Sequence, residues 1–358
     1  MRLVPFALPV LAVVVACAST PTATPPPAAD PWAPVDSVMR QTIAAGTVPG
    51  AALVVHDAQH RVVFRRSYGD FAADRRVPVA SASKLIAGLV LFDLIGRGRL
   101  SLESTTAQVL GWTGVRGTIT LRHLLSFTSG LAPIAACTFD AGATLAECVD
   151  RIRLAPVNAA PGQRFDYGST HLHVAARMAE VASGRTWNVL FRETLATPLG
   201  LSTEVTFFTI PRQAMGTGNP LVAGGLRAST DEYMQLLAVA SARGQYRGLS
   251  IGTGALYDQQ MREPFPAVDI GFTPIDPVTL GWRYGFTAWL ECATPATGCT
   301  TVSSPGAFGF TPWIDRANGY YASLGMELSR ADGGVAATSV AIASRLKPAL
   351  VAALRAAR

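Results

Sequence analysis

Residues Ala80–Ile86, ASASKLI in one-letter code, place a Ser-x-x-Lys motif at the start of an apolar segment. Apolar residues recur at helical spacing through Ser83–Ile95, just before a glycine, which predicts a buried helix. One helical turn separates Ser81 from Lys84, so both side chains lie on one face and the amine can reach the hydroxyl. A serine hydroxyl is a weak nucleophile until a base takes its proton. The motif therefore predicts a nucleophile beside its base.

Lysine is rare in this chain. Of the 30 lysines and arginines, only Lys84 and Lys347 are lysines. Ser-x-x-Lys occurs by chance on many helices, but arginine cannot release its proton in a protein, whereas a buried lysine can. A lysine inside the motif is thus what a deprotonatable base requires.

Short apolar segments near both ends of the chain predict a sheet. The expected extended segments are Ala51–His56, Arg61–Tyr68, Tyr284–Cys292 and Phe310–Leu324. Residues 121–201 carry a helical pattern with long loops, and residues 336–357 form a closing helix. We therefore predict an α+β fold, with an antiparallel sheet built from N- and C-terminal segments and flanked by helices. A mainly helical subdomain is inserted at about residues 100–225.

Several further stretches carry a family resemblance. They are His123–Leu131 (HLLSFTSGL), residues 96–102, Pro198–Leu201 (PLGL) and Gly224–Leu226 (GGL). Together with Ser-x-x-Lys, this ordered set resembles the class C β-lactamase, D,D-peptidase and family VIII esterase group. The resemblance covers about residues 35–350 and places a hydrolase domain at 36–358. It implies the fold named above and a serine mechanism that needs no cofactor.

The second motif of the group is Tyr-x-Asn, and Tyr167-Gly168-Ser169 stands in the matching place. The resemblance implies that the Tyr167 phenol carries a proton to the leaving group and later helps to activate water. The alternative is a tyrosine that merely packs between subdomains. Ser169 replaces the asparagine, so one amide donor to the substrate is missing.

The third motif is usually Lys or His, a small residue and Gly, where this chain has Ser304-Pro305-Gly306-Ala307. The resemblance implies that the backbone N–H groups of Ser81 and Ala307 form an oxyanion hole, with Ser304 and Gly306 beside the substrate. A bare Pro-Gly turn is the alternative. Without the cation, ester or peptide chemistry is expected over efficient penicillin hydrolysis.

Two other patterns suggest different sites. Gly248-Leu249-Ser250-Ile251-Gly252 matches the nucleophile elbow of α/β-hydrolases, but that fold needs a later histidine, and all five histidines lie at or before His173. A glycine-rich loop is expected there instead. His171 and His173 point in different directions on a helix, so we expect structural or surface roles for them and no metal site.

The N-terminus reads as an export signal over residues 1–17, ending in Ala16-Cys17. This ending resembles the bacterial lipobox, in which the cysteine is lipidated; the alternative is ordinary cleavage near Ala18. Residues 18–35 are rich in Pro, Ala and Thr and predict a tether. We expect a periplasmic or cell-envelope protein that is anchored to the membrane by a lipid at Cys17.

Four cysteines remain without Cys17, which allows three pairings. The short separations favour Cys137 with Cys148 and Cys292 with Cys299, in agreement with an oxidising compartment. Zinc is the alternative, but neither pair has CxxC spacing.

The formal net charge is +6, but the arginines are scattered and no basic run predicts a nucleic-acid partner. We expect an exported serine hydrolase that forms an acyl-enzyme on Ser81 with small ester, amide or peptide substrates. The alternatives are a D,D-carboxypeptidase or β-lactamase, and a catalytically weak lipoprotein that binds penicillin or peptidoglycan.

Overall fold

The computed structural model describes residues 1–3, 9, 12, 30–210, 216–275, 280–292, 298–329 and 335–357. Cys17 and residues 18–29 of the expected tether lie outside the described residues. The first helix, α1 (Ala33–Ala44), begins before the expected end of the tether at residue 35. It does so because Val35 is already fully buried against the sheet.

A seven-stranded antiparallel sheet organises the chain, in the order β10-β11-β12-β13-β14-β1-β2. Its strands are β1 (Gly50–Asp57), β2 (Val62–Gly69), β10 (Arg283–Tyr284), β11 (Trp289–Leu290), β12 (Thr301–Ser303), β13 (Thr311–Asp315) and β14 (Tyr320–Gly325). The first two come from the N-terminal part and the other five from the C-terminal part. β1 pairs with β14, with Leu53 opposite Leu324. The predicted sheet built from both ends of the chain is confirmed.

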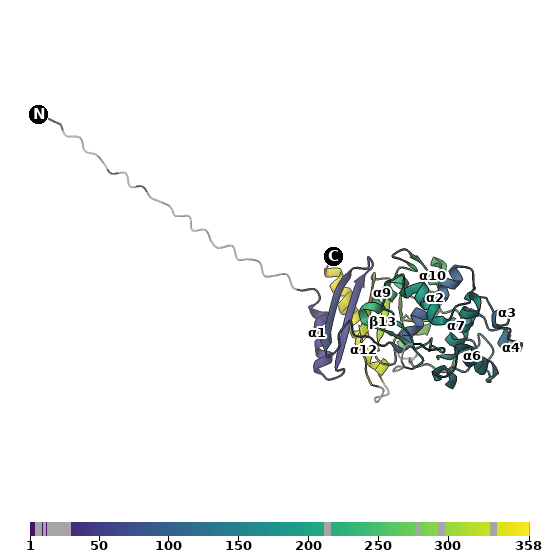
Figure 1. Ribbon diagram of the computed structural model, residues 1–358. Helices are drawn as coiled ribbons and strands as arrows, with labels where there is room; N and C mark the ends of the chain where they lie inside the picture. Colours follow the sequence, from purple (N-terminus) through teal and green to yellow (C-terminus); the bar gives the residue numbers. More distant parts are fainter. Residues whose placement is uncertain are drawn as a thin grey trace.

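Helices cover both faces of this sheet. Along β1, Leu53 and Val55 pack with α1 and the last helix, α12 (Val335–Ala356), whereas Ala52 and Val54 pack into the other core cluster. This alternation follows from the two-residue period of a strand. Figure 1 shows α1 and α12 beside the sheet, with α2 (Ser83–Gly96) and α9 (Thr230–Ser241) toward the larger helical part.

The region between β2 and β10 is mostly helical and extends away from the sheet (Figure 1). Its elements are α3 (Thr106–Leu110), α4 (Gly114–Gly117), α5 (Leu121–Leu125), η2 (Ala136–Phe139), α6 (Leu145–Leu154), α7 (Thr170–Ser183), α8 (Trp187–Phe191), the π-helical turn η3 (Arg192–Ala196) and α10 (Gly254–Gln260). Capping boxes begin four of the helices, at Thr105, Thr120, Thr144 and Ser229, each satisfying backbone N–H groups of a first turn.

Short strand pairs connect these helices. They are β3 (Val77–Pro78), β6 (Leu226–Ala228) and β5 (Thr206–Phe207) in one small sheet, β4 (Arg164–Phe165) with β9 (Asp269–Ile270), and β7 (Gln245–Tyr246) with β8 (Leu249–Ser250). Ser250 thus lies in a two-stranded hairpin. The expected glycine-rich loop over residues 248–252 is thus partly a strand, because Leu249–Ser250 pairs with β7. A serine in this hairpin does not stand between a strand and a helix, as the nucleophile elbow requires.

Both expected disulfides are present, Cys137 with Cys148 and Cys292 with Cys299. Within the described ranges, no three His, Cys, Asp or Glu side chains gather as they would to hold a metal ion. In the same part of the chain, one helical segment, Ala336–Ala356, is long and apolar enough to cross a membrane. It packs on the sheet through Leu346 and Leu350, which are fully buried.

Candidate active site

The Ser-x-x-Lys motif lies where a short 3-10 turn, η1 (Ala80–Ala82), runs into α2. Ala80 has a φ of 47°, a conformation that costs a non-glycine residue free energy. Such strain immediately before Ser81 is typical of a functional turn. Lys84 Nζ lies 2.8 Å from Ser81 Oγ, so the predicted contact between the amine and the hydroxyl is present.

Lys84 is held in an unusual environment for an amine. Its side chain is buried, with the residue 4% exposed, and Nζ also donates to the Ala223 carbonyl at 2.8 Å. The amine lies 4.5 Å from the centre of the Tyr167 ring. Burial disfavours the charged ammonium and lowers the pKa of Lys84 to about 7.

The turn at Gly224 and Gly225 brings Ala223 to Lys84. The Leu226 amide, just after this turn, donates to the Ser83 hydroxyl at 3.0 Å, which ties the turn to the start of α2. A Cβ atom on Gly225 would lie 1.9 Å from the Phe208 carbonyl oxygen, so no larger residue fits there. The Gly-Gly-Leu stretch of the family resemblance thus has a local structural reason.

Tyr167 follows β4 and precedes α7, and its ring is enclosed by other aromatic rings. Trp289 stacks on it at 5.2 Å between ring centres, and Phe127 and Tyr284 meet it edge to face at 5.4 and 5.8 Å. Burial raises the pKa of Tyr167, against the hydrogen bonds of its phenol with Ser81 and Trp289, which lower the pKa. The phenol is therefore a protonated group in contact with Ser81.

Ser304 lies beside Ser81, and its hydroxyl is already hydrogen-bonded. Ser304 Oγ donates to the Ser81 carbonyl oxygen at 2.8 Å, and the residue is 2% exposed. The Gly306 amide donates to the Phe310 carbonyl, and a Cβ atom on Gly306 would lie 2.2 Å from the Val79 carbonyl oxygen. Ser304-Pro305-Gly306 thus packs directly against the turn that carries Ser81.

Ala307 follows this turn and is exposed. Its amide donates to no acceptor among the residues that the structure describes, so the group stays available to an incoming oxygen. The oxyanion hole inferred from the resemblance remains a prediction.

Ser169 is placed differently. It begins α7, and its Oγ lies 3.1 Å from Thr138 Oγ1 in the cysteine loop. This contact joins the motif position to the Cys137–Cys148 loop rather than to Ser81 or Lys84. Both replaced motif residues, Ser169 and Ser304, therefore use their hydroxyls within the protein.

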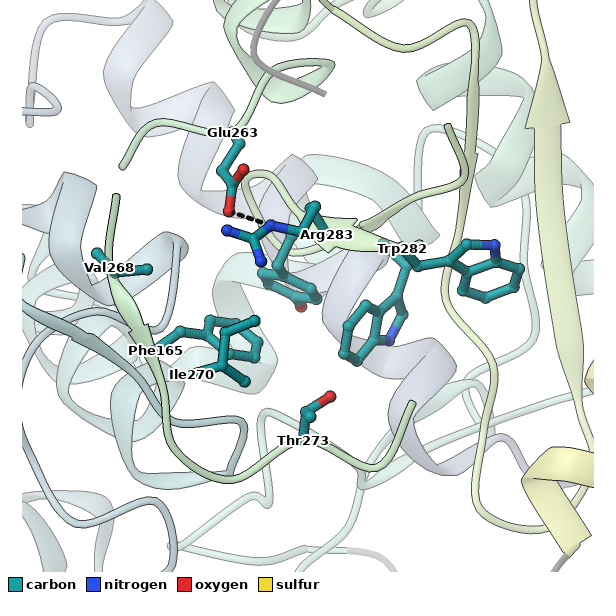
Figure 2. Close-up of a pocket in the computed structure, with 9 residues that line it drawn as sticks. Phe165, Glu263, Val268, Ile270, Thr273, Trp282 and Arg283 are labelled. Atoms are coloured by element: carbon teal, nitrogen blue, oxygen red, sulfur yellow. Dashed lines mark hydrogen bonds and ion pairs between the residues drawn. The ribbon is translucent and has the colours of Figure 1, made fainter. Parts of the chain in front are cut away.

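An aromatic pocket adjoins the far side of the Tyr167 cage. Its lining residues are Phe165, Glu263, Val268, Ile270, Thr273, Trp282, Arg283, Tyr284 and Trp289. Figure 2 shows Phe165 and Ile270 across from Trp282, with Arg283 and Glu263 facing each other at one side. The two charged groups pair at 2.8 Å, which leaves the pocket largely apolar. Tyr284 and Trp289 belong both to this pocket and to the wall around Tyr167.

Sequence reasoning missed several members of the site. Trp289 contacts Tyr167, and Ala223 contacts Lys84. Both contacts form only because segments distant in the sequence pack together. His171 is buried between Ser129 and Asp166, so the surface alternative for it is wrong, as it is for the buried His173. Two sequence patterns pointed to this area, the stretch His123–Leu131 and the motif at Tyr167.

Known proteins resemble the chain in sequence and in structure. Penicillin-binding protein 4 of Amycolatopsis lactamdurans is 31% identical over 182 residues, covering 47% of this chain and 46% of that protein. The chain thus spans about half the length of the curated relatives it matches. A candidate beta-lactamase from Bacteroides dorei has a solved structure with a TM-score of 0.77 and 30% identity, covering 88% of this chain and 98% of that one.

A third similar structure is that of EstCE1, a hydrolase with promiscuous acyltransferase activity. Its TM-score is 0.69 at 20% identity, with 90% of this chain and 98% of that chain covered, a likeness of fold. The family model named Beta-lactamase matches residues 35–344, which contain the whole Ser81, Lys84 and Tyr167 cluster. On this match, the chain belongs to the Beta-lactamase family of serine hydrolases and acyltransferases.

Proposed function

We propose that the protein is a serine hydrolase that cleaves small, neutral esters through an acyl-enzyme on Ser81. Ser81 Oγ attacks the ester carbonyl carbon while its proton passes to the Lys84 amine. The carbonyl oxygen becomes an oxyanion, which the Ser81 and Ala307 amides bind. The bond to the alcohol then breaks, and the alcohol leaves with a proton supplied through Tyr167. Water, deprotonated by the same groups, releases the acid and restores the Ser81 hydroxyl.

The observation that carries this proposal is the state of Lys84. Its amine is buried, and no carboxylate among the described residues pairs with it. A buried charge without a counter-ion is costly, so an amine that is free of its proton near neutral pH is favoured at this position. A purely structural role would not explain why a lysine that is costly to bury lies 2.8 Å from a serine hydroxyl.

The substrate preference follows from the surroundings of Ser81. The third-motif position holds Ser304, whose hydroxyl already binds the Ser81 carbonyl, so it offers no charge to a substrate carboxylate. This feature supports uncharged esters over anionic β-lactams, and small amides or peptides as weaker candidates.

Kinetics on the purified protein that lacks residues 1–29 would test this proposal. We expect kcat/KM for p-nitrophenyl butyrate to exceed that for nitrocefin, and Ser81→Ala to abolish both reactions while the circular-dichroism spectrum stays unchanged. A fluorescent phosphonate should label the unmodified protein and spare Ser81→Ala. Ester hydrolysis by Ser81→Ala at the normal rate would remove Ser81 from the mechanism. Faster turnover of nitrocefin would overturn the substrate preference alone.

A second candidate is a protein that binds penicillin or peptidoglycan without efficient turnover. The engagement of Ser169 and Ser304 within the protein favours it, because two groups that would orient a substrate are occupied. If the protein binds without turnover, the phosphonate and a fluorescent penicillin would label Ser81 to the same extent. Ester hydrolysis would then stay close to the uncatalysed rate.

We also propose that the protein is exported and anchored by a lipid on Cys17. The apolar segment before Cys17 and the two disulfides support this location outside the cytoplasm. In a bacterial host, labelled palmitate should enter the full chain and should be lost in Cys17→Ser. Equal incorporation in both chains would contradict the anchor.

A further inference from the structure

A buried histidine outside the catalytic cluster joins two segments that hold Tyr167. His171 is fully buried on the first turn of α7. Its Nε2 lies 2.7 Å from the Asp166 carbonyl oxygen, and its Nδ1 lies 2.7 Å from Ser129 Oγ. The ring therefore bridges the residue just before Tyr167 and the stretch at Ser129.

The partners of His171 determine its tautomer. A carbonyl oxygen only accepts, so Nε2 carries the proton and donates to Asp166. The deprotonated Nδ1 then accepts from the Ser129 hydroxyl, whose oxygen in turn accepts from the Leu131 amide at 3.3 Å. Every polar atom of the imidazole is satisfied in this single arrangement. Burial lowers the pKa of His171 to about 4, so the neutral ring persists at neutral pH.

Other hydrogen bonds, from the backbone and from the Asp166 side chain, also hold the segment before Tyr167. The Asp166 amide donates to the Phe127 carbonyl, and the Tyr167 amide donates to the Phe272 carbonyl. The Asp166 carboxylate accepts from the Phe272 amide at 2.9 Å. The Asp166 carbonyl is satisfied by His171 alone among the described residues. The peptide that leads into Tyr167 is therefore held at its C=O by one side chain and at its N–H by the Phe272 carbonyl.

A second route connects the same ring to Tyr167. The His171 ring stacks on Phe127 at 5.0 Å, and Phe127 meets the edge of Tyr167 at 5.4 Å. Phe127 has a φ of 59°, so its unusual backbone depends on the packing around it. Both routes from His171 end at the phenol that lies beside Ser81.

We propose that His171 is a positioning residue, which aligns the Tyr167 phenol with Ser81 by donating from Nε2 to the Asp166 carbonyl. This inference rests on the role of Tyr167 in the proposed function. A displaced phenol still leaves Ser81 and Lys84 in place, so loss of the hydrogen bond should lower kcat and leave KM nearly unchanged. Misalignment of a reacting group costs on the order of 10- to 100-fold in rate.

A matched pair of variants would isolate the hydrogen bond. His171→Gln and His171→Asn both lose the stacked ring, but only the glutamine amide reaches the position of Nε2 and can donate to Asp166. We expect His171→Gln to retain kcat for p-nitrophenyl butyrate within about threefold of the unmodified protein, and His171→Asn to lose about 10- to 100-fold. Equal values of kcat in the two folded variants would overturn the proposal, because stacking or packing would then explain the whole effect.

The same pair in the Tyr167→Phe background gives a second readout. If His171 acts through the phenol, the difference between glutamine and asparagine should vanish there, as non-additivity requires of coupled residues. A difference that persists would contradict the inference. If Tyr167→Phe itself retains full kcat, the role of Tyr167 in the proposed function fails instead, and the two failures are distinguished.

Ser129→Ala provides the test if the His171 variants do not fold. It removes the hydroxyl that fixes Nδ1 as the acceptor and leaves the imidazole in place. We expect a smaller loss in kcat, about three- to tenfold by the same reasoning, with KM and the melting temperature measured alongside. An unchanged kcat in Ser129→Ala would contradict the proposed tautomer and its positioning effect.

Discussion

The amine of Lys84 and the chemistry proposed for it can be tested by changing the group without changing its charge. Lys84→Arg keeps a cation but cannot accept the Ser81 proton. We expect kcat/KM for p-nitrophenyl butyrate to fall by about 1,000-fold or more, because the nucleophile loses its base.

Lys347→Arg is the matched control, since Lys347 is the other lysine of the chain. It pairs with Glu291 and lies over the Trp282 and Trp313 rings, contacts that a guanidinium can also make. Activity and melting temperature should change little in this control. An active Lys84→Arg protein would remove Lys84 from the role of base.

The pH dependence follows from the same buried amine. The pKa of Lys84 is lowered to about 7 by burial, so about a tenth of the molecules carry the free amine near pH 6 and about nine tenths near pH 8. We expect kcat/KM to rise through this range and then level off. A profile that stays flat from about pH 5.5 to 8.5 would contradict a titrating base.

The free energy of unfolding should also rise with pH. A lysine whose pKa is lower in the folded chain than in the unfolded chain takes up fewer protons when folded, so the penalty for burying it is greatest below the folded pKa. The contribution of Lys84 to the free energy of unfolding therefore improves as the pH rises from about 7 toward the unfolded pKa. Lys84→Met should remove this part of the pH dependence, as urea denaturation at several pH values would show.

Among the elements, the loop closed by Cys137 and Cys148 lies next to the active-site helix α7. Its Thr138 contacts Ser169 at 3.1 Å, and Asn219 donates to the Cys137 carbonyl at 2.8 Å. Replacing both cysteines by alanine should lower the free energy of unfolding by about 2 to 3 kcal/mol in the chain-entropy model. Because the loop supports the start of α7, kcat/KM should also fall.

The other disulfide, Cys292 with Cys299, provides the comparison. It closes a shorter loop, with a separation of 7 residues against 11, so its entropic contribution is slightly smaller. Urea denaturation and ester kinetics on both double variants would measure stability and activity together. A larger loss of kcat/KM without Cys292 and Cys299 than without the α7 loop disulfide would contradict the support assigned to that loop.

For the molecule as a whole, we expect one face of the sheet to contribute to stability and the other to support the candidate active site. Leu350 belongs to α12 and is fully buried against the sheet, on the face opposite the one that packs against α2. Leu350→Ala should lower the free energy of unfolding by about 2 to 5 kcal/mol, while kcat at low temperature stays close to that of the unmodified protein. Arg345→Ala, at an exposed position of the same helix, is the control and should change stability by less than about 0.5 kcal/mol.

Thermal and urea unfolding combined with single-temperature kinetics would check this separation. A large fall in kcat in Leu350→Ala, measured where the variant is still folded, would contradict this separation. The two faces would then be coupled, and α12 would contribute to the geometry of the site.

Much of this architecture was predictable because its information is local in the sequence. Apolar residues at helical spacing predicted α2, and the short β-branched segments near both ends predicted the sheet. The close spacing of Cys137 and Cys148 predicted their disulfide, and a separation of three residues placed Lys84 on the face of Ser81. In each case, backbone geometry relates residues a few positions apart, so a pattern along the chain suffices.

Packing between distant segments decided the rest. The burial that lowers the pKa of Lys84, the Ala223 carbonyl that binds its amine and the Ser304 hydroxyl on the Ser81 carbonyl join segments that no periodicity relates. His171 was expected to be structural or exposed, and only its contacts on both ring nitrogens revealed a link to Tyr167. Residue types and spacing therefore predicted which chemistry is available, whereas burial and the direction of each hydrogen bond arise only when the folded chain excludes water and brings these segments together.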